Sequence, residues 1–295
     1  MRLILSLAIV LLTASCKNNQ WIVTVYASQD QVYAEPILRQ FEQETGIRVR
    51  AIYDSEAVKT VGLVNRLIAE KANPQCDVFW NNEELRTRQL ESRGVVERWA
   101  AVGFRSRGMI VNTNLLSSPP KSLVDLTNAV WKRKAALAYP LFGTTATHFL
   151  ALRQQWGAET WEHWCRALKA NEPFLVDGNS VVVQLVGRGE AVIGLTDSDD
   201  IAAGQKQGLP IRAVPLAEST LLIPNTVAII RGAPNPTEAQ RLYEHLQSES
   251  VRKALIAASA LEGDRPGHIG FKPDWVRLLA DLEPATATLK TVFLR

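Results

Sequence analysis

Strand and helix patterns alternate through the first hundred residues of the body of this 295-residue chain. Trp21–Tyr26 is a β-branched apolar run of strand length, and Ala34, Ile37, Leu38 and Phe41 then recur at the spacing of one helical face. The same alternation continues with strands over 47–51 and 77–80 and with helices over 61–68 and 83–93. Strands linked in this way pair in parallel through right-handed crossovers, so the sequence predicts an α/β protein built on an open sheet.

A second unit of the same kind begins near residue 105. We expect its strands over 107–112, 135–139, 175–176 and 191–195, with helices between them. The apolar run 221–230 is expected to return the chain toward the first unit, and residues 237–260 to form a helical hairpin or one long helix. The chain is long enough for two such units of ordinary domain size.

Open α/β sheets bind ligands beyond the carboxyl ends of their strands. The segments that follow the first three strands are short and polar, and they are 27–30, 54–56 and 81–83. Ser28 and Asn82 are therefore candidate ligand-binding residues.

Gly143, Thr144 and Thr145 stand where a strand leads into a helix. A helix N-terminus offers unpaired N–H groups and a partial positive charge, so it favours anions, and glycine lets the backbone approach closely. The alternative is that Thr144 only caps its helix. Both interpretations use the same groups and both stay open.

Two more turns lie at strand ends. In Asp177–Ser180, Asn179 or Ser180 is expected either to cap the next helix or to face a ligand. Thr196–Asp200 gathers Asp197, Asp199 and Asp200 after a buried strand. Such carboxylates suit a hard cation, an amine or ligand hydroxyls, although the helix dipole also favours acids there. We favour a ligand-facing role for them.

Composition and motifs argue against several classes of function. The formal net charge is only +3 and no dense Lys/Arg block occurs, which does not favour nucleic-acid binding. No G-x-S-x-G, H-E-x-x-H, P-loop or C-x-x-C motif is present, and His148, His163, His245 and His268 lack metal-ligand spacing. We expect no catalytic residues and no cofactor.

The first sixteen residues have the pattern of a secretory signal. Arg2 precedes an apolar run from Leu3 to Leu12, which is about half the roughly 20 residues that span a membrane. Small residues then precede Cys16, as in a bacterial lipobox, so 1–16 is expected to be a lipoprotein signal peptide and Cys16 to be lipidated. The alternative is an ordinary signal peptide with an incidental cysteine.

Cys76 and Cys165 are the remaining cysteines. An oxidising compartment would permit a disulfide between them, but isolated cysteines far apart in sequence are more often small buried apolar residues. We favour the second interpretation.

Six segments together resemble an extracellular solute-binding protein of bacterial ABC importers, in its iron(III)-binding, ferric-binding-protein-like branch. They are 23–28, 41–47, 67–71, 77–80, 187–194 and 223–227. The resemblance implies the type II periplasmic-binding-protein fold, an α/β fold with two doubly wound lobes, a hinge and a central ligand cleft. We expect lobe I over 21–104 plus about 231–262, and lobe II over about 105–230 plus about 263–295.

The resemblance also bears on the ligand. Ferric-binding members use two adjacent tyrosines with a His and a Glu. In this chain Asp199 and Asp200 stand at the positions of the tyrosines and Asp30 stands at that of the His. The position of the Glu falls at Asn82 or Glu83. Glu83, Asp199 and Asp200 would be the ligands of any metal. The family's anion seat corresponds to Gly143, Thr144, Thr145 and Asn179.

The expected function is that of a monomeric, lipid-anchored, substrate-binding lipoprotein of an ABC importer. It would capture a small anionic solute, of phosphorylated sugar, polyol or phosphonate type, in the periplasm or on the extracytoplasmic face of the membrane. It would deliver that solute to a permease in the inner membrane. The alternatives are ferric iron with a synergistic anion and, from another class, an envelope enzyme or a ligand sensor on the same fold.

Overall fold

The computed structural model describes residues 21–53, 60–214, 216, 220–263 and 270–294. Cys16 with the expected signal peptide, and segment 54–56, lie outside these residues. The described strands are β1 Ile22–Ala27, β2 Arg48–Tyr53, β3 Val78–Asn81, β4 Val96–Asn112, β5 Ala135–Ala138, β6 Phe174–Val176, β7 Ile193–Asp197, β8 Ile211–Val214 and β9 Leu222–Ile230. The α-helices are α1 Gln31–Thr45, α2 Val61–Ala69, α3 Glu84–Ser92, α4 Gly143–Trp156, α5 Ala158–Ala170, α6 Asn179–Arg188, α7 Ser198–Lys206, α8 Pro236–Leu246, α9 Glu249–Ala257 and α10 Trp275–Phe293, with short 3₁₀ turns at Val124–Thr127 and Ala129–Trp131.

The strands form one mixed sheet in the order β2-β1-β3-β9-β4-β7-β5-β6, and β8 also pairs with β4. In one half of the sheet β1 lies parallel to β2 and β3, and in the other half β5 lies parallel to β6 and β7. The strand–helix alternation therefore predicted the parallel pairs correctly. Antiparallel β9 joins β3 to β4.

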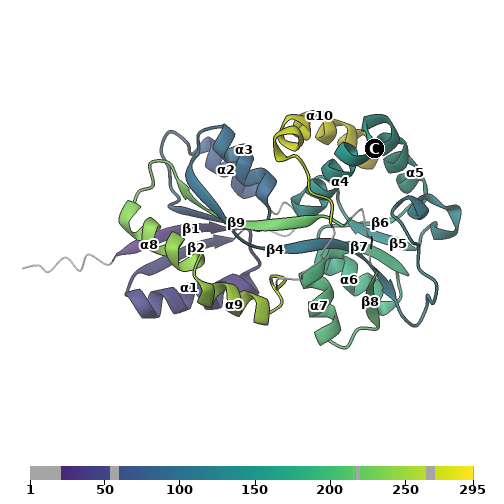
Figure 1. Ribbon diagram of the computed structural model, residues 1–295, viewed down its shortest axis with the longest axis horizontal. Helices are drawn as coiled ribbons and strands as arrows, with labels where there is room; N and C mark the ends of the chain where they lie inside the picture. The colour runs from purple at the N-terminus through teal and green to yellow at the C-terminus, as the bar shows by residue number, and fades with distance from the viewer. Residues whose placement is uncertain (1–20, 54–59, 215, 217–219, 264–269, 295) are drawn as a thin grey trace, which may run out of the picture.

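Strand β4 connects the two halves. Its residues 96–106 pair with β9, and its residues 107–112 pair with β7 and β8 (Figure 1). The sequence predicted a strand over 107–112 only, which is wrong for its start. Charged residues such as Arg98 interrupt the apolar pattern before 107, and the long ladder with β9 forms the strand regardless of that pattern.

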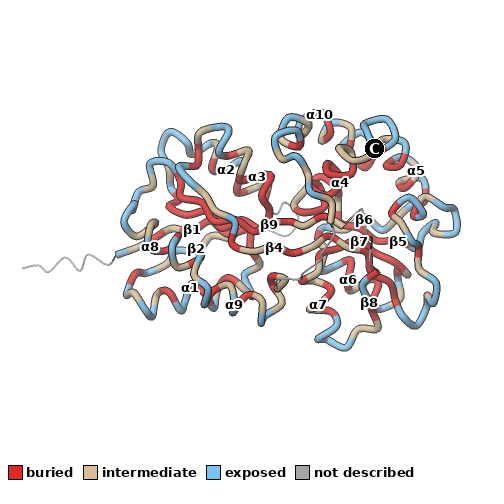
Figure 2. Tube along the Cα trace, in the orientation of Figure 1, coloured by how far each residue is buried: buried red, intermediate tan, exposed pale blue. Residues whose placement is uncertain are grey.

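Helices cover both faces of each half (Figure 1). In the first half, α1, α8 and α9 pack on one face around Phe41 and Leu242, and α2 and α3 pack on the other around Leu67 and Phe79. In the second half, α4, α5 and α10 enclose a core around Phe149, and α6 and α7 enclose another. Figure 2 shows the buried residues concentrated along the strands of both halves.

Both remaining cysteines are fully buried free thiols in apolar clusters. Cys76 lies among the residues under α2 and α3, and Cys165 lies in the core under α4 and α5. The preferred interpretation of these cysteines as small core residues is confirmed.

Of the two alternatives for segment 237–260, one long helix is wrong, because α8 ends at Leu246 and Ser248 caps a second helix, α9, by accepting the N–H of Val251. Helix α10 was not predicted as an element, and it packs against α4, α5 and α3. Among the described residues, no helix combines the length and the apolar character that crossing a membrane requires.

Candidate ligand-binding cleft

A small polar cavity of about 30 Å³ lies where the two halves of the sheet meet. The first half contributes the start of α1 and the end of β3, strand β4 crosses at its base, and the second half contributes the N-terminal ends of α4, α6 and α7. The residues around it are Asp30, Asn82, Arg105, Ala138, Tyr139, Phe142, Gly143, Thr144, Thr145, Asp177, Gly178, Asn179, Asp197 and Asp200. This is the edge of the sheet at which the sequence predicted a site.

Among the described residues, four helices, α1, α4, α6 and α7, begin at this cavity without a side-chain capping hydrogen bond. The N-caps of α1 and α7 are the acidic residues Asp30 and Asp197, whereas α4 begins after Phe142 and α6 begins after Gly178, and neither of these two residues offers a side-chain acceptor. The alternatives in which Thr144, Asn179 or Ser180 caps a helix are therefore wrong. Gly143 has a φ of 52°, a conformation that favours glycine, and it turns the chain into α4. The N-termini of α4 and α6 are left with the electrostatic preference for an anion.

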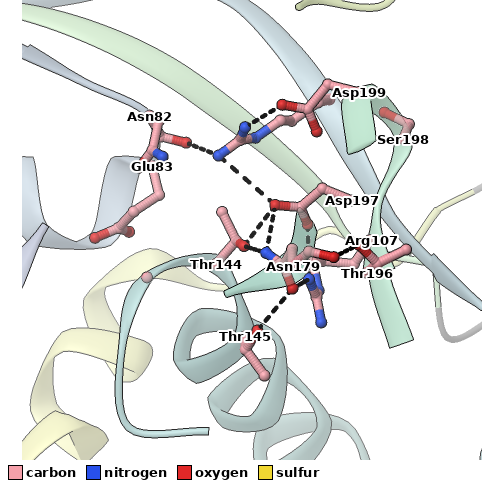
Figure 3. A network of polar contacts seen from close by, with 12 residues as sticks. Asn82, Glu83, Arg107, Thr144, Thr145, Asn179, Thr196, Asp197, Ser198 and Asp199 are labelled. Atoms are coloured by element: carbon pink, nitrogen blue, oxygen red, sulfur yellow. Dashed lines mark hydrogen bonds and ion pairs between the residues drawn. The ribbon is translucent and has the colours of Figure 1, made fainter. Parts of the chain in front are cut away.

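Asp197, the last residue of β7, accepts hydrogen bonds from three side chains (Figure 3). Its Oδ2 accepts from the Thr144 hydroxyl at 2.6 Å and from Asn179 Nδ2 at 3.1 Å. Its Oδ1 accepts from Arg107 Nη1 at 2.8 Å. Burial by itself would raise the pKa of the Asp197 carboxyl, but Arg107 and Arg105 outweigh burial and hold that pKa below its ordinary range. Asp197 thus organises the seat as an ionised carboxylate.

Thr145 and Asn179 complete this side of the cleft. The Thr145 hydroxyl donates to Asn179 Oδ1 at 3.3 Å, and the same oxygen accepts from Arg107 Nη1 at 2.9 Å. The structure thus brings Thr144, Thr145, Asn179 and Asp197 together. The Thr145 contact is the longest of those among them and is therefore weak.

Arg105 extends from β4 between the two halves. Its Nη1 donates to Asp199 Oδ2 at 2.5 Å, and its Nη2 donates to the Asn82 carbonyl at 3.3 Å and lies 3.7 Å from Asp197 Oδ2. Its side chain is almost completely buried. Burial opposes the charge, but Asp199 and Asp197 raise the pKa of Arg105 above its ordinary value. The guanidinium is therefore a fixed positive charge at the base of the cleft.

Asp199 and Asp200 stand in the first turn of α7. One oxygen from each of Asp197, Asp199 and Asp200 lies within 4.8 Å of the others. Burial, which outweighs the opposing effect of Arg105, raises the pKa of Asp199 to about 6, and burial with the neighbouring carboxylates raises that of Asp200 well above its ordinary value. Both shifts favour the protonated, neutral form of these two carboxyls.

The structure places Ser28 differently from the ligand-binding role expected of it, and it places Glu83 apart from the two aspartates with which it was expected to hold any metal. The Ser28 hydroxyl donates to Asn81 Oδ1 at 2.7 Å and accepts the N–H of Asn82 at 3.2 Å, so it joins the ends of β1 and β3 beneath the cavity. The Glu83 carboxylate points away from Asp197 and Asp199 (Figure 3). It accepts the Arg86 N–H at 3.1 Å and caps α3. Asn82 lines the cavity as expected.

Two tyrosines lie at or near the cavity. Tyr139 lines the cavity. Burial, together with Asp199 and Asp30, raises the pKa of the Tyr33 hydroxyl to about 12. That shift opposes formation of a phenolate, so the protein environment does not prepare Tyr33 as a metal ligand.

Arg105 and Arg107 were missed as functional residues from the sequence. They stand two residues apart, and in a strand this spacing puts both side chains on one face. Two arginines at that spacing within a strand that continues as the apolar run from Met109 are a detectable signal for a buried charged site.

Comparison with known proteins bears on this cleft. A family model described as bacterial extracellular solute-binding protein matches residues 23–258. The chain belongs to this family. Its extracytoplasmic location and its role as a binder of small solutes follow from that membership.

Curated relatives include the major ferric iron-binding proteins of Neisseria gonorrhoeae, 22% identical over 81% of this chain and 79% of that protein, and of Neisseria meningitidis serogroup B, 23% identical over the same shares. Among solved structures, iron-bound HitA from Pseudomonas aeruginosa superimposes with a TM-score of 0.80 at 22% identity, over 92% of this chain and 99% of that one. AfuA from Actinobacillus pleuropneumoniae with fructose-6-phosphate bound gives 0.79 at 19% identity, over 93% and 99%. The expected type II periplasmic-binding-protein fold is confirmed.

Proposed function

We propose that this chain is the substrate-binding lipoprotein of an ABC importer. It captures a small anionic solute of phosphorylated sugar, polyol or phosphonate type and releases it unchanged. The observation that carries the proposal is that α4 and α6 both begin at one cavity without a side-chain cap. Two helix N-termini directed at one cavity form an anion-binding site.

The anionic group of the solute binds at the α4 and α6 end. The backbone N–H groups at the start of α4, the backbone N–H of Asn179 at the start of α6 and the Thr145 hydroxyl are donors there, and Gly143 allows close approach of the backbone. Thr144 supports the seat through its bond to Asp197. Hydrogen bonds of this kind to a charged group are shorter and stronger than those to a neutral one.

The uncharged part of the solute faces Asp30, Asn82 and Asp200, which line the cavity at the other end. Carboxylate oxygens accept hydrogen bonds from hydroxyl groups, as sugar and polyol hydroxyls require. A phosphate at one end and hydroxyls at the other therefore match the two ends of the cleft. AfuA, whose structure holds fructose-6-phosphate, shares this fold and supports this class of solute.

Ferric iron with a synergistic anion is the second candidate, because the carboxylates of Asp197, Asp199 and Asp200 lie within 4.8 Å of one another and because several relatives are ferric iron-binding proteins. The donors do not fit it well. Asp197 is already engaged by Arg107, Thr144 and Asn179, and Asp199 by Arg105. A visible charge-transfer band on ferric titration would support phenolate-bound iron and count against the phosphorylated solute.

Native mass spectrometry of the purified protein, with a thermal-shift screen, tests the proposal. Fructose 6-phosphate and simple phosphonates are expected to raise the melting temperature by mass action, whereas fructose, which lacks the anion, is not. A bound phosphorylated compound retained through purification would support the proposal. Failure of every phosphorylated sugar and phosphonate to bind would overturn it, and a changed mass of the recovered ligand would indicate an enzyme.

The proposal also includes a lipid anchor on Cys16 and a permease as the partner. Cys16 carries the lipid that holds a monomeric receptor at the extracytoplasmic face of the membrane, near a permease in the inner membrane. Metabolic labelling with palmitate is expected to mark the wild-type protein and not Cys16→Ser. Neighbouring permease and ATPase genes would favour import over ligand sensing.

A further inference from the structure

The Arg105 guanidinium lies among the carboxylates at the base of the cleft. Arg105 Nη1 lies 2.5 Å from Asp199 Oδ2, and Arg105 Nη2 lies 3.7 Å from Asp197 Oδ2. A metal ion bound by the three-aspartate group would need contacts with the same two carboxylates. The guanidinium therefore pairs with one Asp199 oxygen and places its positive charge beside the carboxylates that a metal ion would use.

Arg105 is fixed in this position by the fold. It lies opposite Ile223 in the β4–β9 ladder, two residues before β4 begins to pair with β7. Its side chain also donates to the Asn82 carbonyl at 3.3 Å, on the other side of the cleft. Because both Arg105 and Asp199 are at most 3% exposed at their side chains, solvent screens their charges little.

The carboxylates would otherwise be suited to a cation. Asp199 Oδ1 is buried and has no hydrogen-bond partner within the described structure, and Asp200 lines the cavity. Hard oxygen ligands of this kind are what divalent and trivalent cations prefer. Arg107 cannot supply the charge that Asp199 needs, because its Nη1 is directed to Asp197 and Asn179.

We propose that Arg105 is a specificity-determining residue: it is a built-in counter-ion that bars metal ions from the Asp197, Asp199 and Asp200 carboxylates. This inference rests on the proposed function, since it explains how a fold shared with ferric iron-binding proteins would accept an organic anion instead. Because Arg105 pairs with Asp199 and Arg107 pairs with Asp197, these two carboxylates repel an incoming phosphate or phosphonate group less than unpaired carboxylates would. Removal of the guanidinium converts the three aspartates into a cation site.

Isothermal titration calorimetry with Tb³⁺ and Mn²⁺ tests this role in wild-type protein, Arg105→Gln and Arg105→Lys. Removing a fixed charge next to the carboxylates is expected to tighten cation binding by about tenfold to a thousandfold in Arg105→Gln. Arg105→Lys keeps the charge and is expected to bind cations as weakly as wild type. Arg166→Gln, at the exposed ion pair with Glu162 on α5, is the matched control for loss of one positive charge.

Equal cation affinity in wild type and Arg105→Gln would overturn the inference, as would tight binding by wild type. Adding Asp199→Asn to Arg105→Gln should abolish the gain, and a gain that persists would place the cation elsewhere and overturn it too. If Arg105→Gln does not fold alone, it is refolded with Mn²⁺: recovery supports the role, and no recovery contradicts it. Fructose 6-phosphate binding by the wild-type protein is measured separately. That measurement tests the proposed function, and the cation affinities test the role of Arg105, so the two can fail independently.

Discussion

Arg107 and Asp197 lie opposite each other in the antiparallel ladder of β4 and β7, and Arg107 Nη1 is 2.8 Å from Asp197 Oδ1. Both side chains are at most 1% exposed. The strand that passes between the halves of the sheet is therefore joined to the second half by a buried ion pair directly beneath the anion seat. Loss of this ion pair would therefore affect both the stability of the fold and the shape of the cleft.

Asp197→Asn is expected to lower the free energy of unfolding by about 3 to 5 kcal/mol, because it leaves the Arg107 charge buried without its counter-charge. Urea denaturation followed by circular dichroism measures the loss. Asp281→Asn, which breaks the more exposed pair with Arg153, is the control and should cost no more than about 1 kcal/mol. Equal effects of the two variants would show that the buried pair has no special weight.

Thr145→Val is expected to weaken fructose 6-phosphate binding about tenfold, because it removes one hydroxyl donor to the anion while keeping the side-chain shape. Calorimetric titration gives the affinity, and thermal unfolding shows whether the fold is intact. The control is Thr291→Val on α10, where the hydroxyl donates to the Ala287 carbonyl far from the cleft. Unchanged affinity in Thr145→Val would remove this hydroxyl from the anion seat.

Glu83 predicts a pH-dependent stability. Burial raises the pKa of its carboxyl from 4.5 to about 7, although Arg86 and the Thr147 hydroxyl oppose the shift. Below about pH 4.5 the carboxyl is protonated in both states. Between that pH and about 7 the folded state holds a proton that the unfolded state has lost, so stability falls as the pH rises. The full loss is about 3 to 4 kcal/mol.

Glu83→Gln removes this component and keeps an oxygen that can accept the Arg86 N–H. Its stability relative to wild type is therefore expected to increase from about pH 5 to about pH 8. Urea unfolding at a series of pH values measures the difference. A constant difference across that range would mean that Glu83 does not titrate there in the folded protein.

The sequence predicted the layered architecture well because its signals are local. Ala34, Ile37, Leu38 and Phe41 were expected to form one apolar helix face, and all four are buried on α1. Thr144, Asn179 and Asp197 were expected near one another because each follows a strand of a parallel sheet, and hydrogen bonds join them. Short-range periodicity and the topological rule for ligand sites were sufficient for these residues.

The ion pairs of Arg105 and Arg107 depend instead on how strands that are distant in the sequence pair with one another. Arg105 and Arg107 acquire their partners only because β4 runs from the ladder with β9 into the ladder with β7. The chain before 107 does not show the period of a buried strand, so the spacing of the two arginines could indicate a buried charged site but not which residues they pair with. Ser28 was expected at the ligand, but the Asn81 side chain and the Asn82 N–H take up its hydroxyl. Whether such a side chain faces a ligand or bonds to a neighbouring residue is decided by packing and not by its position after a strand.

The crossing segment of β4 contains a glycine whose conformation is testable. Gly103 has a φ of 143° at an irregularity in the β4–β9 ladder. A Cβ atom there would lie 2.6 Å from Leu261 Cδ1. Gly103→Ala is therefore expected to lower the free energy of unfolding by about 1 to 3 kcal/mol, from backbone strain together with displacement of the leucine.

A double-mutant cycle with Leu261→Ala separates the two causes. Leu261 is a buried core residue, so its truncation alone should cost about 2 to 5 kcal/mol. If contact with the new Cβ contributes, Gly103→Ala will cost less in the Leu261→Ala background, with a coupling of about 0.5 kcal/mol or more. Full additivity would assign the whole effect to the strained φ. No destabilisation in either background would mean that the crossing strand does not require glycine at this position.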